Sequence, residues 1–147
     1  MYDQILIPYD GSDEARKAAV HGIELAAALG STVHALYVID LPGAPRALAL
    51  RDDEEEIREQ YREYGEEVTG ELAEVAAEHG VDCVTAIKTG SPADRIVAYA
   101  DEEGMDAILM GSAYQGTLGA LLGSTTDKVV RAATVSVITQ RMEMNEH

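Results

Sequence analysis

Short stretches of continuously apolar residues alternate along the chain with longer segments in which apolar residues recur every three or four positions. The short stretches predict strands at 4–9, 32–39, 81–87, 107–110 and 135–139. The longer segments predict helices at 13–29, from about 52 to 79, from 92 to about 103, and from 124 onward. Apolar strands that alternate with helices are typical of a parallel sheet that helices cover on both sides.

Polar residues and glycines mark the ends of these helices. Ser12 is placed to cap the first helix, Asp13 and Glu14 suit the positive end of its dipole, and Gly30 ends it. The segment 91–94, Ser-Pro-Ala-Asp, reads as a capping box with proline at the first helical position. The long second helix has one apolar seam, made of Ile57, Tyr61, Tyr64, Val68, Leu72 and Val75.

The elements also predict the domain organisation and the topology. A chain of 147 residues suits one domain, which we place at 1–141, with a frayed tail at 142–147. Right-handed crossovers restrict an open α/β sheet of five parallel strands to a Rossmann-like or flavodoxin-like arrangement. We therefore predict such a sheet, with helices on both faces.

Composition narrows the class of protein further. Apolar residues make up 46 % of the chain, which is typical of a globular protein. We find no apolar run long enough to span a membrane, and the first residues have neither a basic start nor a cleavage pattern. The lone Cys83 lies in a predicted strand, which favours a buried, inert thiol and excludes an internal disulfide. We expect a cytoplasmic protein.

The charge balance is strongly acidic. Asp and Glu total 27 against 11 Lys and Arg, a net charge of −16, and only three of the basic residues are lysines. Such a surface repels nucleic acids and anionic membranes, so neither is expected as a partner. Molar salt screens this self-repulsion, which favours the salt-loaded cytoplasm of a halophilic archaeon. An ordinary acidic protein is the alternative, and the scarcity of lysine favours the halophile.

The segment from Gly111 to Asp127 is the strongest candidate for chemistry. It follows a predicted strand, contains four glycines within thirteen residues and leads into a helix start at Ser124. Bare backbone N–H groups and a helix N-terminus together suit an anion such as phosphate. The same glycines are compatible with a loop that merely turns, and Ser124 with a simple cap. This segment alone leaves both interpretations open.

Three further segments should meet this loop in space. Ligands of open α/β sheets lie beyond the carboxyl ends of the strands, where the strand order reverses. The residues expected there are 8–12, 38–40, 88–91 and 111–126. Together they form a plausible bed for a nucleotide, although Asp10 taken alone is better explained as a turn residue before Gly11.

The motifs at 5–12, 36–40, 110–112 and 121–130 resemble the universal stress protein family, in the same order and spacing. The resemblance covers about residues 2–140 and implies the sheet order 3-2-1-4-5. It also implies an ATP site. In that site Tyr9 and Val38 would flank the adenine, Asp10 would meet the ribose or a phosphate-bound Mg²⁺, and the phosphates would lie at the 123–126 turn. The residues carried over are Pro8, Tyr9, Asp10, Val38, Met110, Gly111, Gly116, Gly123, Ser124, Thr125 and Thr126.

The glycine loop departs from the family pattern. Tyr114 stands where the second motif glycine is expected, and the interval to Gly123 is one residue short, so Gly116 would have to take over in a shifted loop. No Lys or Arg occurs from Gly111 until Lys128. These departures favour the alternative function, a homodimeric interaction module of the same fold that binds no nucleotide.

Enzymatic functions find little support in the sequence. The chain lacks a P-loop and a nucleophile elbow, and its four histidines lack metal-binding spacing. No general base or arginine finger is placed for phosphoryl transfer, so we expect ATP to act as a ligand and not as fuel. The fifth predicted strand, 135–139, should lie at an edge of the sheet. The resemblance implies that two such strands pair in a homodimer.

Overall fold

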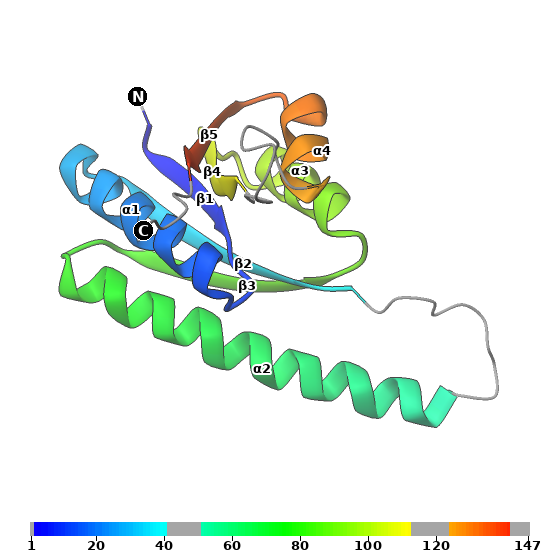
Figure 1. Ribbon diagram of the computed structural model, residues 1–147. Helices are drawn as coiled ribbons and strands as arrows, with labels where there is room; N and C mark the ends of the chain where they lie inside the picture. Colours follow the sequence, from blue (N-terminus) through cyan, green and yellow to red (C-terminus); the bar gives the residue numbers. More distant parts are fainter. Residues whose placement is uncertain (1, 41–50, 113–123, 142–147) are drawn as a thin grey trace, which may run out of the picture.

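Strands and helices alternate along the chain in the computed structural model, which describes residues 2–40, 51–112 and 124–141, the side chains of 51–54 and 112 excepted. The elements are β1 (Gln4–Pro8), α1 (Asp13–Leu29), β2 (Thr32–Ile39), α2 (Arg51–Glu78), β3 (Cys83–Thr89), α3 (Pro92–Glu102), β4 (Ala107–Ser112), α4 (Ser124–Ala132) and β5 (Ser136–Arg141) (Figure 1). The segment 142–147, which the sequence predicts to be a frayed tail, lies outside the described residues.

All five strands are parallel and follow the order β3-β2-β1-β4-β5, which confirms the predicted sheet. The strand order reverses at β1, which pairs with β2 along its whole length. Its pairing with β4 is limited to Ile5 with Ala107 and Leu6 with Ile108. Beyond Leu6, β1 continues along β2, where the Tyr9 amide donates to the Leu36 carbonyl at 2.8 Å. The carboxyl ends of β1 and β4 therefore part, as a ligand crevice requires.

Helices cover the two faces of the sheet in pairs, α1 with α2 and α3 with α4 (Figure 1). Because side chains alternate along a strand, Ile5 and Ile7 join the core beneath α1 and α2, whereas Leu6 joins the core beneath α3 and α4. Each face thus has its own buried cluster. The sheet separates them, as in other doubly covered α/β proteins.

Two helical glycines allow these helices to approach the sheet closely. A Cβ atom on Gly65 of α2 would lie 2.4 Å from Cδ2 of Tyr37 on β2. A Cβ atom on Gly22 of α1 would lie 2.7 Å from Cδ1 of Ile7 on β1 and 3.1 Å from Cδ2 of Leu109 on β4. Helix α1 therefore packs across the junction between β1 and β4, on the face opposite to α3 and α4.

The helix boundaries follow the local signals in most places. Helix α1 has its predicted bounds, the Ser12 hydroxyl accepts a hydrogen bond from the Ala15 amide at 3.1 Å, and Gly30 has a φ of 73°. The predicted capping box of α3 is wrong, because Ser91 occupies the N-cap position but its side chain makes no capping hydrogen bond. Pro92 at the first helical position already fixes the helical φ, which starts the helix without that bond.

Four strands differ from their predicted ranges, and β1 does so only by ending one residue earlier, at Pro8. Strand β3 begins at Cys83 and not at residue 81, because the Val81 amide closes the end of α2 by donating to the Ala76 carbonyl at 2.9 Å. Strands β4 and β5 extend to residues 112 and 141, and Val135 precedes the ladder of β5. Cys83, which was predicted to be buried, is half-buried, and burial raises the pKa of its thiol.

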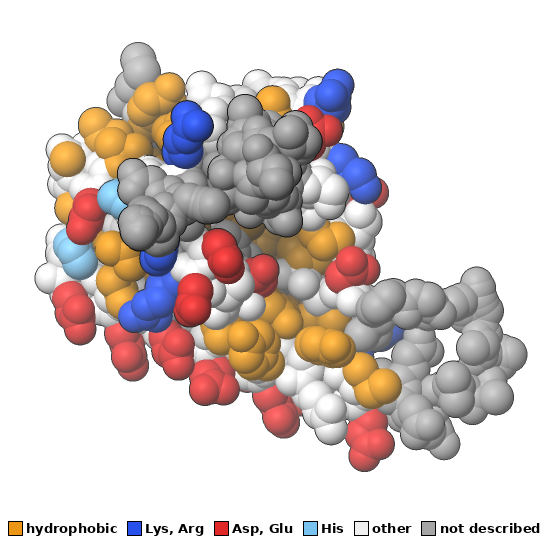
Figure 2. Space-filling model, in the orientation of Figure 1, with side chains coloured by type: hydrophobic (Ala, Val, Ile, Leu, Met, Phe, Trp, Pro, Cys, Tyr) orange, Lys and Arg blue, Asp and Glu red, His pale blue; other side chains and the backbone are white. Residues whose placement is uncertain are grey.

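Only half of the predicted seam of α2 is buried. Val68 and Leu72 are buried in the core, whereas Ile57, Tyr61 and Tyr64 are each exposed by 42–43 %. The first half of the helix extends past the end of the sheet (Figure 1) and therefore has little to pack against. Figure 2 shows hydrophobic atoms on this face, with Asp and Glu side chains along the outer edge of α2.

Candidate functional site

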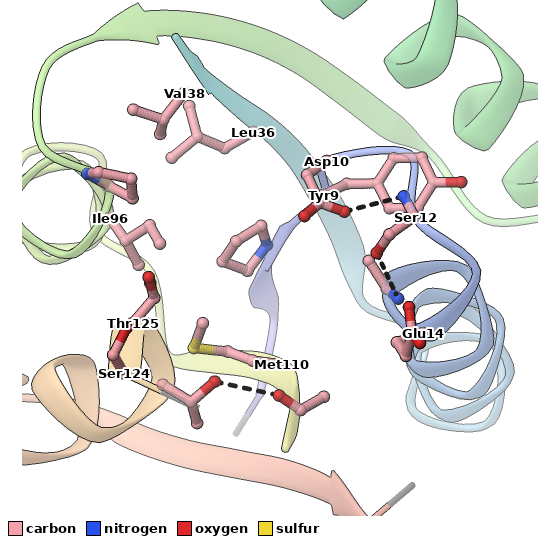
Figure 3. Close-up of a pocket in the computed structure, with 15 residues that line it drawn as sticks. Tyr9, Asp10, Ser12, Glu14, Leu36, Val38, Ile96, Met110, Ser124 and Thr125 are labelled. Carbon is pink, nitrogen blue, oxygen red and sulfur yellow. Dashed lines mark hydrogen bonds between the residues drawn. The ribbon is translucent and has the colours of Figure 1, made fainter. Parts of the chain in front are cut away.

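A cavity of about 340 Å³ lies at the carboxyl ends of the central strands, on the face that α3 and α4 cover (Figure 3). This volume is within the usual range of about 300–1,000 Å³ for small-molecule sites. The lining residues come from β1 and the turn after it, from β2 and β4, and from the first turns of α1, α3 and α4. They are Pro8, Tyr9, Asp10, Ser12, Glu14, Ala15, Leu36, Val38, Pro92, Ile96, Met110, Gly111, Ser124, Thr125 and Thr126.

One part of the cavity is an apolar slot. Its walls are side chains of even-numbered strand positions, which face α3 and α4, together with residues of α3. Leu36 and Ile96 are nearly fully buried, at 1 % and 2 % exposure. Figure 3 shows Val38 and Leu36 of β2 above the slot, Ile96 at one side and Met110 of β4 below. A narrow apolar slot of this kind suits a flat, weakly polar group such as a nucleobase.

The turn between β1 and α1 forms one polar edge of the cavity. Oδ1 of Asp10 accepts a hydrogen bond from the Ser12 amide at 2.9 Å. Gly11 has a φ of 84°, and a Cβ atom there would lie 2.3 Å from the Tyr64 hydroxyl oxygen. That hydroxyl donates to the Asp10 carbonyl over 3.4 Å. Helix α2, on the opposite face, therefore helps to hold the turn that presents the Asp10 carboxylate.

The start of α4 forms a second polar edge. The Thr126 hydroxyl donates to the Gly111 carbonyl at 3.0 Å, which ties the first turn of α4 to the end of β4. Ser124 and Thr125 precede it at the cavity (Figure 3). The first N–H groups of a helix have no acceptor within the helix, and they carry the positive end of its dipole. This edge is therefore suited to an anion.

The structure brings together most of the residues that the sequence singled out. The described ones all line the cavity: Pro8, Tyr9, Asp10, Val38, Met110, Gly111, Ser124, Thr125 and Thr126. Gly116, Gly123 and Tyr114 lie outside the described residues, so the departure from the family loop stays a sequence observation.

Tyr9 lines the cavity in a different way from the one expected. Its ring belongs to the core beneath α1 and α2 and is only 4 % exposed. Burial raises the pKa of its hydroxyl, and a hydrogen bond with Arg16 partly offsets that rise. Figure 3 shows the ring directed away from Val38 and Ile96, so it does not face the slot in which an adenine would lie. The odd position of Tyr9, after Ile5 and Ile7, already indicated this face.

Sequence reasoning missed part of the apolar slot and one charged side chain. Leu36 precedes Val38 by two positions, and Ile96 lies on the buried face of α3, so strand alternation and helical periodicity could have found both. Glu14 was read only as a residue of the first helical turn, and the structure places it at the cavity.

The carboxylates of this site do not form a metal centre by themselves. Asp10 and Glu14 line the cavity. Within the described ranges, no three His, Cys, Asp or Glu residues are grouped to hold a metal ion. One carboxylate fits a Mg²⁺ ion that takes its other ligands from water and from the phosphates of a bound nucleotide. The donor set suits an ion of that kind and not a resident structural metal.

An open parallel sheet with this strand order and helices on both faces defines the class of flavodoxin-like α/β domains. The chain matches the model of the universal stress protein family over residues 1–141. The chain therefore belongs to the universal stress protein family.

Similar proteins cover nearly the whole chain. It is 33 % identical to universal stress protein MJ0531 of Methanocaldococcus jannaschii over 99 % of the chain and 86 % of that protein. The solved structure of protein MJ0577 superposes with a TM-score of 0.86 at 27 % identity, covering 99 % of both chains. A universal stress protein in complex with cAMP has the same fold, with a TM-score of 0.72, 24 % identity, and 97 % and 98 % coverage.

In the ranges that the structure describes, every helix is too short or too polar to cross a membrane.

Proposed function

We propose that this protein binds an adenine nucleotide, ATP with Mg²⁺, in the cavity at the carboxyl ends of β1, β2 and β4, and acts as a stress-response or signalling module. One observation carries the proposal: an apolar slot lies beside the N-terminus of α4 at the point of strand reversal. A nucleotide has a flat apolar part and an anionic part, and the two regions of the cavity match them.

The proposed placement follows from the surfaces that line the cavity. The base would lie against Val38, Ile96 and Met110, where backbone groups of β2 can read its polar edge. The phosphates would lie at the first turn of α4, near Ser124 and Thr125. A fold of this kind accommodates an adenine nucleotide in the cAMP complex, which is similar to this chain at the level of fold.

Asp10 is the residue proposed to meet Mg²⁺ carried by the phosphates. Its carboxylate lies at the cavity edge, and the Ser12 amide fixes its orientation through Oδ1. A bound Mg²⁺ would supply positive charge to offset that of the phosphates. Asp10→Ala should therefore weaken ATP binding in a Mg²⁺-dependent way. Equal losses with and without Mg²⁺ would assign Asp10 to the turn alone.

The nucleotide is proposed as a ligand and not as a substrate for rapid turnover. The described part of the lining contains no Arg, Lys or His that could stabilise the charge of a transferring phosphoryl group. Binding would then act by favouring one conformation of the turn after β1, which Tyr64 links to α2.

We also propose that the protein works in the cytoplasm of a salt-loaded cell as a homodimer. Strand β5 lies at an edge of the sheet, and pairing with a second copy would cover its open side. A dimer that binds no nucleotide remains the second candidate. The absence of a basic side chain from the described lining, together with Tyr114 in the loop, favours it.

Isothermal titration with Mg-ATP at high KCl separates the two candidates, at a protein concentration of about 0.1 mM, where weak nucleotide sites release measurable heat. We expect saturable binding, lost in Val38→Phe, whose ring would fill the slot. Val130→Phe is the matched control, because Val130 is 42 % exposed on α4 and does not line the cavity. Absence of binding by the unmodified protein would leave the dimeric module as the function.

A further inference from the structure

The charges around the cavity are one-sided. Two carboxylates, those of Asp10 and Glu14, line it, and no Lys or Arg does so in the part that the structure describes. The segment 113–123, which joins β4 to α4, contains no charged residue in the sequence. Arg16 is engaged with the Tyr9 hydroxyl, Arg131 is paired with Asp127 at 2.9 Å, and Arg95 of α3 lies against Gly90; none of these three arginines lines the cavity.

Helices α1 and α4 differ in what they offer an anion, and α3 also begins at the cavity, with Pro92, which has no N–H, and the acidic Asp94 in its first turn. At the start of α1, the Ser12 hydroxyl already accepts the Ala15 amide, and the Asp10 carboxylate accepts the Ser12 amide. Asp13 and Glu14 add two negative charges to the same turn. In the first turn of α4 the one acidic residue, Asp127, is paired with Arg131. Of the ends of α1 and α4, the α4 end, worth about half a positive charge, therefore stands against the two carboxylates that line the cavity.

Glu14 is placed to oppose any ligand that extends beyond the α4 edge. Figure 3 shows Ser124 and Thr125 on one side of the cavity and Glu14 on the other, with Met110 between them. A first phosphate can lie at α4. Each terminal phosphate group carries about −1.5 to −2 charges, so every extension of the chain of phosphates brings more negative charge toward Glu14.

We infer that this cavity selects its nucleotide by charge, with Glu14 as the specificity-determining side chain. This inference rests on the proposed function and refines its ligand class. The site accepts a nucleoside monophosphate, or a triphosphate whose charge Mg²⁺ offsets, and it rejects the metal-free triphosphate. Because repulsion grows with ligand charge, removal of the Glu14 charge must help the triphosphate more than the monophosphate.

The test compares dissociation constants for AMP, Mg-ATP, and ATP with EDTA, measured by titration calorimetry on the full chain. The variant is Glu14→Gln. The matched control is Asp13→Asn, which removes the same charge from the same helical turn at an exposed residue that does not line the cavity. Both replaced side chains are exposed, and circular dichroism checks that each variant keeps its fold.

We expect the unmodified protein to bind AMP at least about tenfold more tightly than metal-free ATP, and Mg-ATP to fall between them. Glu14→Gln should strengthen metal-free ATP binding by about fivefold and AMP binding by less than about twofold. Asp13→Asn should change both by less than about twofold. The selectivity should shrink between about 0.1 M and 1 M salt, as the screening length falls from about 10 Å to 3 Å.

Two results would overturn this inference while leaving the proposed function intact. The first is equal strengthening of AMP and metal-free ATP by Glu14→Gln, and the second is an equally selective effect of Asp13→Asn. Absence of binding by all three ligands, to the unmodified protein and to Glu14→Gln alike, would overturn the proposed function and this inference together.

Discussion

The two faces of the sheet are built differently, and the difference locates the cavity. Helices α1 and α2 have 17 and 28 residues, whereas α3 and α4 have 11 and 9. Beneath the long helices the core continues to the carboxyl ends of the strands, through Tyr9 and Tyr37. Beneath the short helices it stops earlier, and the cavity begins there. The cavity thus opens on the face of the two short helices, whose first turns line it.

The faces also differ in buried polarity and in charge. Beneath α3, the ring of His34 lies between Tyr99 and Gln4, with Nδ1 at 2.8 Å from the Tyr99 hydroxyl and Nε2 at 2.9 Å from Oε1 of Gln4. Because Oε1 can only accept, Nε2 carries the proton and the Tyr99 hydroxyl donates to Nδ1. On the other side of the sheet, α2 has twelve acidic residues and three arginines, so this helix holds −9 of the net charge of −16.

Truncating a buried side chain in the core beneath α1 and α2 should have the largest effect on stability. Leu72 of α2 is 1 % exposed, and Leu72→Ala should lower the free energy of unfolding by about 2–5 kcal/mol, because it leaves a cavity in the core. Ile57→Ala, in the exposed half of the same helix, should cost less than about 0.5 kcal/mol. Urea denaturation at molar KCl measures both. Similar losses in the two variants would show that the exposed half of α2 is packed in solution.

Salt should change the melting temperature mainly by screening the acidic side chains of α2. Reducing KCl from molar to millimolar concentration should lower the melting temperature by about 10 °C, because the screening length grows from about 3 Å to beyond 10 Å. Neutralising Glu59 and Glu63 on α2 should weaken this salt dependence more than neutralising Asp94 and Glu102 on α3. Circular dichroism melts give the comparison. A melting temperature independent of KCl would contradict the proposed adaptation to salt.

Replacing the two glycines of α2 by alanine should change the stability of the protein in opposite directions. Gly65→Ala places a methyl group against the Tyr37 ring, and we expect it to destabilise the protein by about 1–3 kcal/mol despite the higher helix propensity of alanine. Gly70→Ala meets nothing within 4 Å and should stabilise by up to about 1 kcal/mol. Differential scanning calorimetry of the two variants measures both effects. Stabilisation by Gly65→Ala would mean that α2 lies farther from β2.

His34, in the core beneath α3 and α4, should make the stability of the protein sensitive to acid. Burial lowers the pKa of His34, and the charge of Glu103 partly offsets this. The unfolded chain therefore binds the proton more tightly than the folded protein. The contribution of His34 to the free energy of unfolding is therefore fully present above the ordinary pKa of about 6.5. It falls as the pH drops toward the lowered value, by at most about 1.4 kcal/mol per pH unit.

In His34→Gln this pH-dependent contribution should be absent, whereas His21→Gln should retain it, because His21 is exposed. Identical pH profiles in the unmodified protein and His34→Gln would exclude the effect.

The sequence predicted elements well where local signals act alone. The bounds of α1 and β2 agree with the structure because Ser12, Gly30 and continuous apolar runs act over a few residues. The exposed half of α2 was not foreseeable, because periodicity identifies an apolar face without showing how far the sheet extends beneath it. Tyr9 illustrates the same limit within the site. Tyr9 lines the cavity, but the direction of its ring depends on strand alternation and on packing beneath α2.

The short pairing between β1 and β4 also has a consequence for how the protein opens. The strand ladder between the β1-β2-β3 half of the sheet and the β4-β5 half has two residue pairs, beside which the Asp106 amide donates to the Gln4 carbonyl at 2.8 Å. Helix α1 lies across that line through Gly22, between Ile7 and Leu109. The line between the halves is a natural boundary for sub-global unfolding, at which amide hydrogens of β4 and β5 would exchange as one unit. A nucleotide held between Val38 and Ser124 would join the two halves on the face opposite to α1. Its binding would then appear as slower exchange across the whole sheet, far from any atom it touches.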